Sequence, residues 1–161
     1  MKKKTMADLI AIVVVVVVLI SAGVVYKGEK LPGPVSTQDV EYLRWDLNTW
    51  DLESAHLELL RNAALRLDFG DMELYVGMLY DDANKALDEI DQFSVSPWLQ
   101  PSKDEFKLSQ QDLRRAGYYI ERGARNIDVD DIKTAVEYFE RFTKHLERSN
   151  ALLPSFYKER R

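Results

Sequence analysis

The strongest constraint on this chain is an apolar segment that runs from Leu9 to Tyr26 without a charged residue. A membrane-spanning helix needs about 20 apolar residues, with roughly 17–25 tolerated. Three lysines (Lys2–Lys4) precede the segment, and such a bias favours a cytoplasmic N-terminus. The sequence therefore predicts a cytoplasmic basic N-terminus over 1–8 and a transmembrane signal anchor over 9–26. The remaining chain is expected to be extracytoplasmic, as in a single-pass protein of the cytoplasmic membrane.

A cleavable signal peptide is the first alternative for this segment. Its apolar core is usually about 7–15 residues long and precedes a small-residue cleavage site. Ser21, Ala22 and Gly23 supply such a site, but the apolar run resumes after them and ends at Tyr26 and Lys27. An aromatic and a cationic residue at that place are typical of a membrane interface, which favours an uncleaved anchor.

A pilin-like subunit is the second alternative. The lysines of Lys2–Lys4 and Asp8 loosely resemble the charged leader and the acidic residue near the start of the apolar helix in type IV pilins. In pilins that helix continues into the globular head. Here Pro32 and Pro34 interrupt it, and proline inside a helix costs about 3 kcal/mol.

Composition narrows the classes of function. The chain has 161 residues, enough for one anchor and one domain, and no cysteine, which excludes disulfides, thiolate catalysis, cysteine-ligated metals and a lipid anchor through cysteine. It carries 27 acidic and 22 basic residues. Binding of nucleic acid requires a basic face that neutralises phosphates, and the predicted helices show none. We therefore expect no nucleic-acid partner.

After a linker over 27–37, apolar residues recur every three or four positions, as they do along one face of a helix. This periodicity predicts an all-α domain over 38–154 that is followed by a basic aromatic tail over 155–161. Helices with short turns between them predict an up-down-up-down antiparallel four-helix bundle. The helices are expected over 38–67, 72–93, 103–127 and 131–153. The expected core residues are Val40, Leu43, Leu47, Trp50, Leu57, Leu60, Ala63, Ala64, Leu67, Met72, Val76, Leu79, Ala83, Ala86, Ile90, Phe93, Phe106, Leu113, Ala116, Ile120, Ala124, Ile127, Ile132, Ala135, Val136, Phe139, Phe142, Leu146 and Leu153.

The predicted helix ends follow from residues that favour caps. Gly70 is expected to take a left-handed conformation and Asp71 to cap the second helix. Ser102 and Glu105 have the spacing of a capping box at the start of the third helix. The fourth helix is expected to start at Asp130 or Asp131.

The turn sequences 67–72 and 127–132 align with each other. This match suggests two copies of one helical hairpin. Convergence of two short turns on aspartate and a flanking apolar residue is the alternative.

Two motifs raise the question of a metal site. Glu53 and His56 form a Glu-x-x-His motif, but a di-iron site in a bundle needs two such motifs and two further glutamates. His145 lacks the glutamate that would complete a second motif, so a surface or boundary histidine is predicted at His56.

Asp128, Asp130 and Asp131 could suggest calcium. The sixth and twelfth positions of an EF-hand loop counted from Asp128 would be Lys133 and Phe139 instead of glycine and glutamate, so helix capping is predicted. Motifs of nucleotide binding or hydrolysis are absent from the sequence. We expect no cofactor, no metal and no enzyme activity.

An antiparallel bundle whose first helix leaves the membrane places both short turns at the far tip. There the partner candidates are Asp68, Phe69, Asp71, Asp128, Val129 and Asp130. The long loop and the tail return to the membrane, where aromatic and cationic residues suit an interface with anionic headgroups. The membrane-interface candidates are Tyr26, Lys27, Trp98, Leu99, Phe156, Tyr157, Lys158, Arg160 and Arg161. Trp98 and Phe156 have an alternative role as plugs at the bottom of the core.

These features predict a non-catalytic accessory, scaffold or assembly subunit of a membrane or cell-surface complex. Its expected partners are the lipid bilayer and membrane or cell-surface proteins, and self-association stays open. One alternative is a ligand-sensing bundle that works with a separate signalling partner, similar in architecture to chemoreceptor ligand domains. The other is the pilin-like filament subunit.

Overall fold

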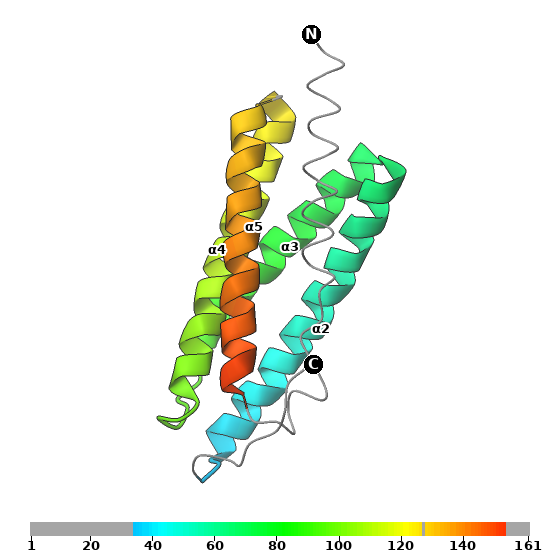
Figure 1. The fold of residues 1–161 in the computed structure, drawn as a ribbon. Coiled ribbons are helices and arrows are strands. Elements are labelled where there is room, and N and C mark those ends of the chain that lie inside the picture. The colour runs from blue at the N-terminus through cyan, green and yellow to red at the C-terminus, as the bar shows by residue number, and fades with distance from the viewer. Residues whose placement is uncertain (1–33, 127, 154–161) are drawn as a thin grey trace.

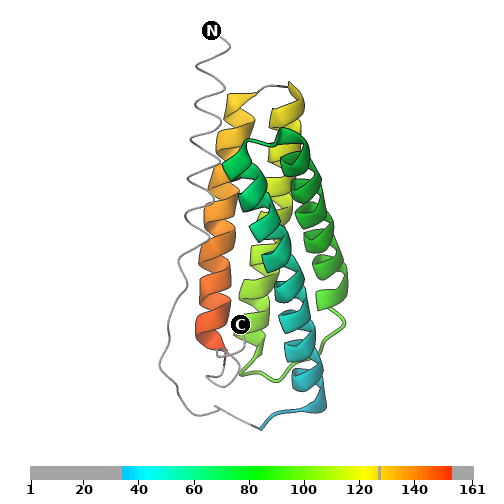
Figure 2. The same ribbon diagram turned by 90° about the vertical axis from the view of Figure 1, so that its right-hand side faces the viewer.

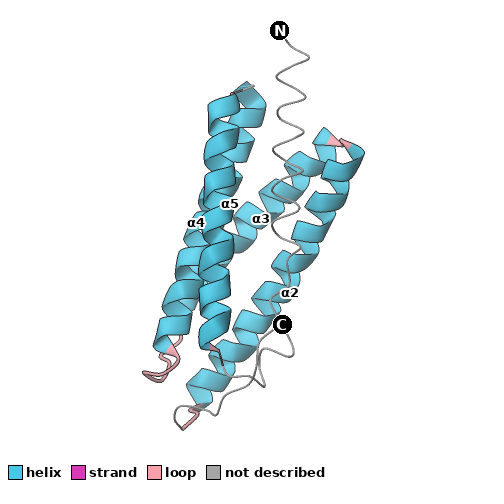
Figure 3. Cartoon of the chain, viewed as in Figure 1, coloured by secondary structure: helices cyan, strands magenta, loops and turns pink. Residues whose placement is uncertain are grey.

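In the computed structural model, the described residues are 34–126 and 128–153, and they form four α-helices and no strand (Figure 3). The helices are α2 (Thr37–Arg66), α3 (Phe69–Ile90), α4 (Gln100–Asn126) and α5 (Val129–Leu152). The predicted all-helical class is therefore confirmed.

The helices run antiparallel in chain order (Figures 1 and 2). The α2–α3 and α4–α5 turns lie at one end of the bundle, and the loop between α3 and α4 lies at the other end with the start of α2. α4 packs against α3 and α5, and α3 packs against α2. Both short turns therefore share one tip, as the sequence predicts.

None of the four described helices is apolar over a stretch long enough to span a bilayer. The predicted anchor over 9–26 and the tail over 155–161 lie outside the described residues.

α2 begins with a capping box that the sequence analysis missed. The Asp39 N–H donates to Ser36 Oγ (3.0 Å), and the Ser36 N–H donates to Asp39 Oδ2 (2.8 Å). The Asp39 carboxylate also accepts bonds from the Ser96 N–H (2.7 Å) and the Ser96 hydroxyl (2.6 Å). Burial acts to raise the pKa of Asp39, but these bonds outweigh it and hold the pKa below its ordinary value. Asp39 thus ties the start of α2 to the α3–α4 loop.

Three predicted helix starts need correction. Asp68, instead of Asp71, is the N-cap of α3, and its side chain accepts a bond from the Asp71 N–H. α4 begins at Gln100, which leaves Ser102 inside the helix with its hydroxyl donating to the Ser149 carbonyl (3.0 Å). α5 begins after Asp128, earlier than expected. α3 and α5 thus start directly after an aspartate whose side chain accepts from their first N–H groups, whereas the Gln100 N–H at the start of α4 bonds to the Ser96 carbonyl (3.2 Å).

The expected glycine turn is also different. Leu67 takes the left-handed conformation (φ 57°, ψ 34°) at the end of α2, whereas Gly70 is helical. The Asp68 N–H bonds to the Ala63 carbonyl (3.0 Å), and the Asp128 N–H bonds to the Gly123 carbonyl (2.9 Å). The similarity of the two turns therefore extends from sequence to backbone geometry.

The predicted apolar stripes of α3 and α5 form the core, with Leu79, Phe139 and Phe142 nearly or fully enclosed. The stripe of α2 is partly wrong, because Val40 and Leu67 are exposed. Ala124 of α4 is also exposed.

The predicted leucines Leu43, Leu57 and Leu60 are buried. The core-facing side of α2 also carries Asp39, Asp46 and Glu53, all with 0% exposure. Gln110 of α4 reaches across the core and donates to Glu53 (3.2 Å). Since acids occupy inward positions, the apolar residues of α2 do not by themselves mark its buried face.

Candidate functional site

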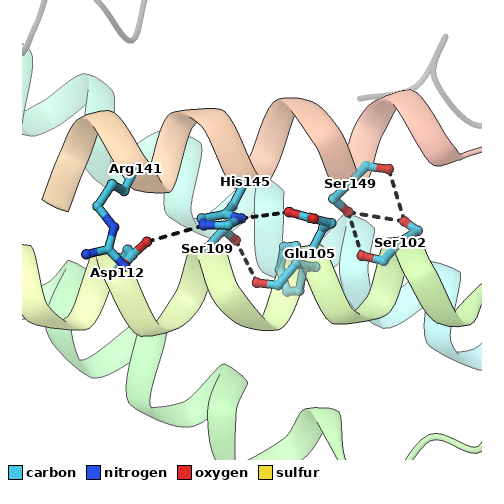
Figure 4. Close-up of polar contacts among 8 residues, drawn as sticks. Ser102, Glu105, Ser109, Asp112, Arg141, His145 and Ser149 are labelled. Carbon is cyan, nitrogen blue, oxygen red and sulfur yellow. Dashed lines mark hydrogen bonds and ion pairs between the residues drawn. The ribbon is translucent and has the colours of Figure 1, made fainter.

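A polar seam joins α4 and α5, with His145 at its centre (Figure 4). His145 Nδ1 lies 2.6 Å from Glu105 Oε2. His145 Nε2 lies 3.8 Å from Asp112 Oδ2, and an Arg141 guanidinium nitrogen lies 3.2 Å from Asp112 Oδ1. The histidine is thus held between two carboxylates of α4.

Asp112 is the most enclosed charge of this seam, with a side chain only 3% exposed. Burial raises its pKa above the ordinary value of 3.8, and the positive charges of Arg141, His145 and Arg115 offset only part of that effect. Removal from water therefore outweighs the ion pairs for this carboxylate.

The hydroxyl groups along the seam are engaged by neighbouring groups. Ser102 and Ser149 each donate to the other's backbone carbonyl (3.0 Å). The Ser109 hydroxyl donates to the Phe106 carbonyl (2.7 Å). The seam has a histidine and carboxylates, but its serines bond to the backbone, so the arrangement holds two helices together and presents no poised nucleophile.

A second histidine–carboxylate pair joins the other two neighbouring helices. His56 Nδ1 of α2 lies 2.5 Å from Asp82 Oδ2 of α3, and the two side chains are 18% and 12% exposed. His56 therefore lies at the core boundary, as predicted. Glu53 points into the core while His56 faces α3, so the two residues of the Glu-x-x-His motif do not converge.

Within residues 34–126 and 128–153, no group of three or more histidine, aspartate or glutamate side chains gathers in a geometry that would hold a metal ion. Asp128 and Asp131, which raised the question of calcium, have other partners. Asp128 caps α5, and the Arg122 guanidinium holds the pKa of Asp131 below its ordinary value.

We expect Asp112→Asn to raise the free energy of unfolding at pH 7. The folded-state pKa of Asp112 is raised, so its contribution to stability is fully present below pH 3.8 and is lost as the pH rises through the folded-state value. Asparagine keeps the shape of the aspartate side chain without the cost of a buried charge. The gain in the free energy of unfolding should therefore shrink as the pH falls toward about 4. Urea unfolding over a pH series measures it.

Asp131→Asn is the matched control with the opposite sign. The pKa of Asp131 is lowered, mainly by the bond from Arg122, so its contribution is present above pH 3.8 and is lost in acid. This variant should lose stability at pH 7, and the loss should shrink as the pH falls below 3.8. A loss of stability at pH 7 in Asp112→Asn would show that the ion pairs outweigh the burial of Asp112.

The tip candidates separate into caps and exposed residues. Asp68 and Asp128 cap α3 and α5. Asp71 and Asp130 pair with Arg66 (3.1 Å) and Lys133 (3.2 Å) at the surface. Phe69 is 41% exposed, whereas Val129 is half-buried.

The sequence-based candidates for the tip do not include three leucines that lie close to Phe69 in sequence and are exposed. Leu65 (60%), Leu67 (47%) and Leu74 (51%) are more exposed than Phe69 itself. The spacing of Leu67 from other apolar residues predicts a core position. The left-handed backbone at Leu67 turns the chain away from the α2 stripe, and the spacing of apolar residues does not reveal such a turn.

The candidates for the membrane interface lie at the opposite end or outside the described residues. Leu99 is fully buried, so it offers no surface to a lipid headgroup, and the prediction for this residue needs correction. Trp98 packs partly against the core and donates from Nε1 to the Pro34 carbonyl (3.2 Å). The candidates outside the described residues are Tyr26, Lys27, Phe156, Tyr157, Lys158, Arg160 and Arg161.

Comparison with known proteins adds no relative to this description. No protein-family model matches the sequence, and searches of curated proteins and of solved structures find no significant match.

Proposed function

We propose that this chain is a membrane-anchored, extracytoplasmic helical bundle that serves as a non-catalytic accessory or assembly subunit. In this proposal the tip of α2 and α3 binds a protein partner. The observation that carries it is Leu67, a residue that is both exposed and held in an unfavourable backbone conformation.

A left-handed conformation costs an ordinary L-residue roughly 1–2 kcal/mol, which is why glycine usually ends a helix in this way. Leu67 adopts it with φ 57° and remains 47% exposed. Core packing does not account for an exposed leucine, and helix termination would favour glycine. Residues held against their conformational preference concentrate at functional sites, so contact with a partner accounts for this leucine.

The neighbours of Leu67 support the same conclusion. Leu65 and Phe69 are each at least 41% exposed and lie two residues before and after it in sequence. Single exposed apolar residues are ordinary, but an exposed apolar cluster with a polar rim is typical of a protein–protein contact. Asp68 and Asp71 supply polar groups at this rim.

The position of the tip fits an anchored subunit. The apolar segment 9–26 precedes α2, and α2 has 30 residues. At 1.5 Å per residue α2 is about 45 Å long. An anchor before Thr37 would therefore hold the α2–α3 tip far from the bilayer, where it can meet a partner.

The test is Leu67→Gly in the full chain, expressed in its native membrane. Glycine removes the left-handed cost but adds unfolded-state entropy, so we expect the free energy of unfolding to rise by about 0.5–1 kcal/mol. Recovery of a stoichiometric partner after mild crosslinking should fall at least about tenfold, as expected when 1.4 kcal/mol of contact is lost. Higher stability with unchanged partner recovery would contradict the proposed role of the tip.

Val40→Gly is the matched control, because Val40 is equally exposed (46%) but lies near the other end of α2. It should leave partner recovery unchanged. Intact mass of the membrane-extracted wild type tests the anchor in the same preparation. A mature chain that starts near Gly23 would show cleavage and contradict the anchor.

A further inference from the structure

The outer face of the α4–α5 hairpin carries an ordered Arg–Tyr cluster. Arg115 and Arg141 lie over the Tyr138 ring (5.5 and 5.1 Å from its centroid). Tyr119 stacks on Tyr138 (5.6 Å, 12°), and Arg122 lies over Tyr119 and Tyr118 (4.9 and 5.4 Å). The Arg–Tyr cluster consists of Arg115, Tyr118, Tyr119, Arg122, Tyr138 and Arg141.

This cluster is exposed although its members contact one another. Tyr118 is 47% exposed, and the side chains of Arg115, Arg122 and Arg141 are 49%, 43% and 51% exposed. Arginine and tyrosine are enriched at protein–protein contacts. Stacked side chains also lose less conformational freedom on binding, so this face is prepared for a partner.

The α2–α3 hairpin has a complementary outer face. Leu52 and Leu59 lie four residues before and three residues after His56, and Met78 lies four residues before Asp82. Residues at these spacings share a side of a helix. Because His56 pairs with Asp82 between the two helices, these apolar residues flank the line where α2 meets α3. The Leu–acid face comprises Leu52 (44% exposed), Leu59 (41%), Leu74 (51%) and Met78 (36%), with the exposed acids Asp51, Glu58, Glu73, Asp81 and Asp88 on the same hairpin.

The charge of this hairpin is strongly one-sided. Between residues 37 and 91, aspartate and glutamate far outnumber the basic residues, which are Arg44, Arg61, Arg66 and Lys85. The α4–α5 hairpin, in contrast, balances its acids with basic residues of which several belong to the Arg–Tyr cluster. The two hairpins form opposite sides of the bundle (Figures 1 and 2). One chain thus presents two complementary faces that it cannot bring together itself.

We propose that the Arg–Tyr cluster of one copy docks on the Leu–acid face of a second copy. The three arginines of the cluster share only two carboxylates, Asp112 and Asp131, so an excess positive charge faces the acidic hairpin and favours this pairing. The exposed leucines supply apolar area. Leu59 and Tyr118 each lie about two helical turns from the short-turn end of their helix. The two faces therefore meet at the same height in copies that stand parallel. The contact joins different patches and can repeat, so it builds a side-by-side row instead of a closed two-fold dimer.

Single-cysteine crosslinking tests this geometry, because the natural chain has no cysteine. Full-length Leu59→Cys and Tyr118→Cys chains with different tags are co-expressed in membranes and oxidised. We expect a mixed disulfide dimer when both variants are present and no dimer when either is alone. Dimers of Leu59→Cys alone would show a two-fold contact of this face and overturn the proposal, as would the absence of the mixed dimer.

Charge substitutions test whether opposite charges hold the two copies together. Leu52→Lys added to the Leu59→Cys chain places a positive charge opposite the arginines, so it should lower the yield of mixed dimer at least about tenfold, or 1.4 kcal/mol, and raised salt should lower the wild-type yield. Val40→Lys, at an exposed position outside this face, is the matched control and should leave the yield unchanged. A third protein crosslinked in place of the mixed dimer would assign the face to another partner and overturn the proposal. Leu67→Gly should not affect this yield, so failure here is distinct from failure of the proposed tip contact.

Discussion

Replacing Phe142 with alanine should lower the free energy of unfolding by about 3–5 kcal/mol. Phe142 is 1% exposed and packs against Phe139 with ring centroids 6.5 Å apart. Truncation removes a buried ring and leaves a cavity that rigid neighbouring helices fill only in part. Chemical denaturation followed by circular dichroism measures the loss.

The matched control is Leu108→Ala, because Leu108 is 41% exposed on the same hairpin. Its cost should stay below about 1 kcal/mol, since much of the side chain already contacts water. A loss below about 1 kcal/mol for Phe142→Ala would mean that α4 and α5 do not enclose this ring.

The second large effect is expected at Gly123, where α4 approaches the start of α5 closely. A Cβ at this position would lie 2.7 Å from Ile132 Cδ1 and 3.0 Å from the Asp128 carbonyl oxygen. The side chain of Ile132 can rotate, but the backbone of Asp128 is held by its own bond to the Gly123 carbonyl. Gly123→Ala should therefore cost about 1–3 kcal/mol through overpacking, which chemical denaturation measures.

Gly77→Ala is the control with the opposite expected sign. Gly77 is also inside a helix, yet a Cβ at this position would have no atom within 4 Å, so the methyl group meets open space. Alanine should stabilise this position by about 0.5–1 kcal/mol, because glycine in a helix interior loses more conformational freedom on folding. Equal effects at the two glycines would contradict the close approach of α4 and α5.

Much of the fold follows from local pattern. The stripes of α3 and α5, including Leu79, Ala83 and Phe139, follow a helical period and are buried as expected. The aspartates of both short turns mark helix starts, although the N-caps are Asp68 and Asp128 and not the residues that follow them. Periodicity and capping depend on neighbours within one or two turns, so one sequence contains enough information to locate them.

The seam between α4 and α5 has no counterpart among the sequence-based predictions. The spacing of Glu105 from Ser102 predicts a capping box, whereas Glu105 pairs with His145 of the next helix. Ser102 likewise bonds to Ser149 across the seam. These partners lie on different helices and are 40 and 47 residues apart in sequence. Their contact depends on how far each helix is rotated about its axis, which no local pattern specifies.

The amino-acid sequence alone determined the helical class, the number of helices in the domain and the end of the bundle at which both short turns lie. Only the tertiary structure decided that acids share the buried face of α2 with the predicted leucines. Glu53 and Asp39 are polar, and an inward position is favourable for them because Gln110 and Ser96 from distant segments supply hydrogen bonds. The tertiary structure likewise decided that Leu67 is exposed and Leu99 enclosed. Whether a residue is buried depends on its contacts with distant segments. Its apolar character supplies only one part of the free energy of burial.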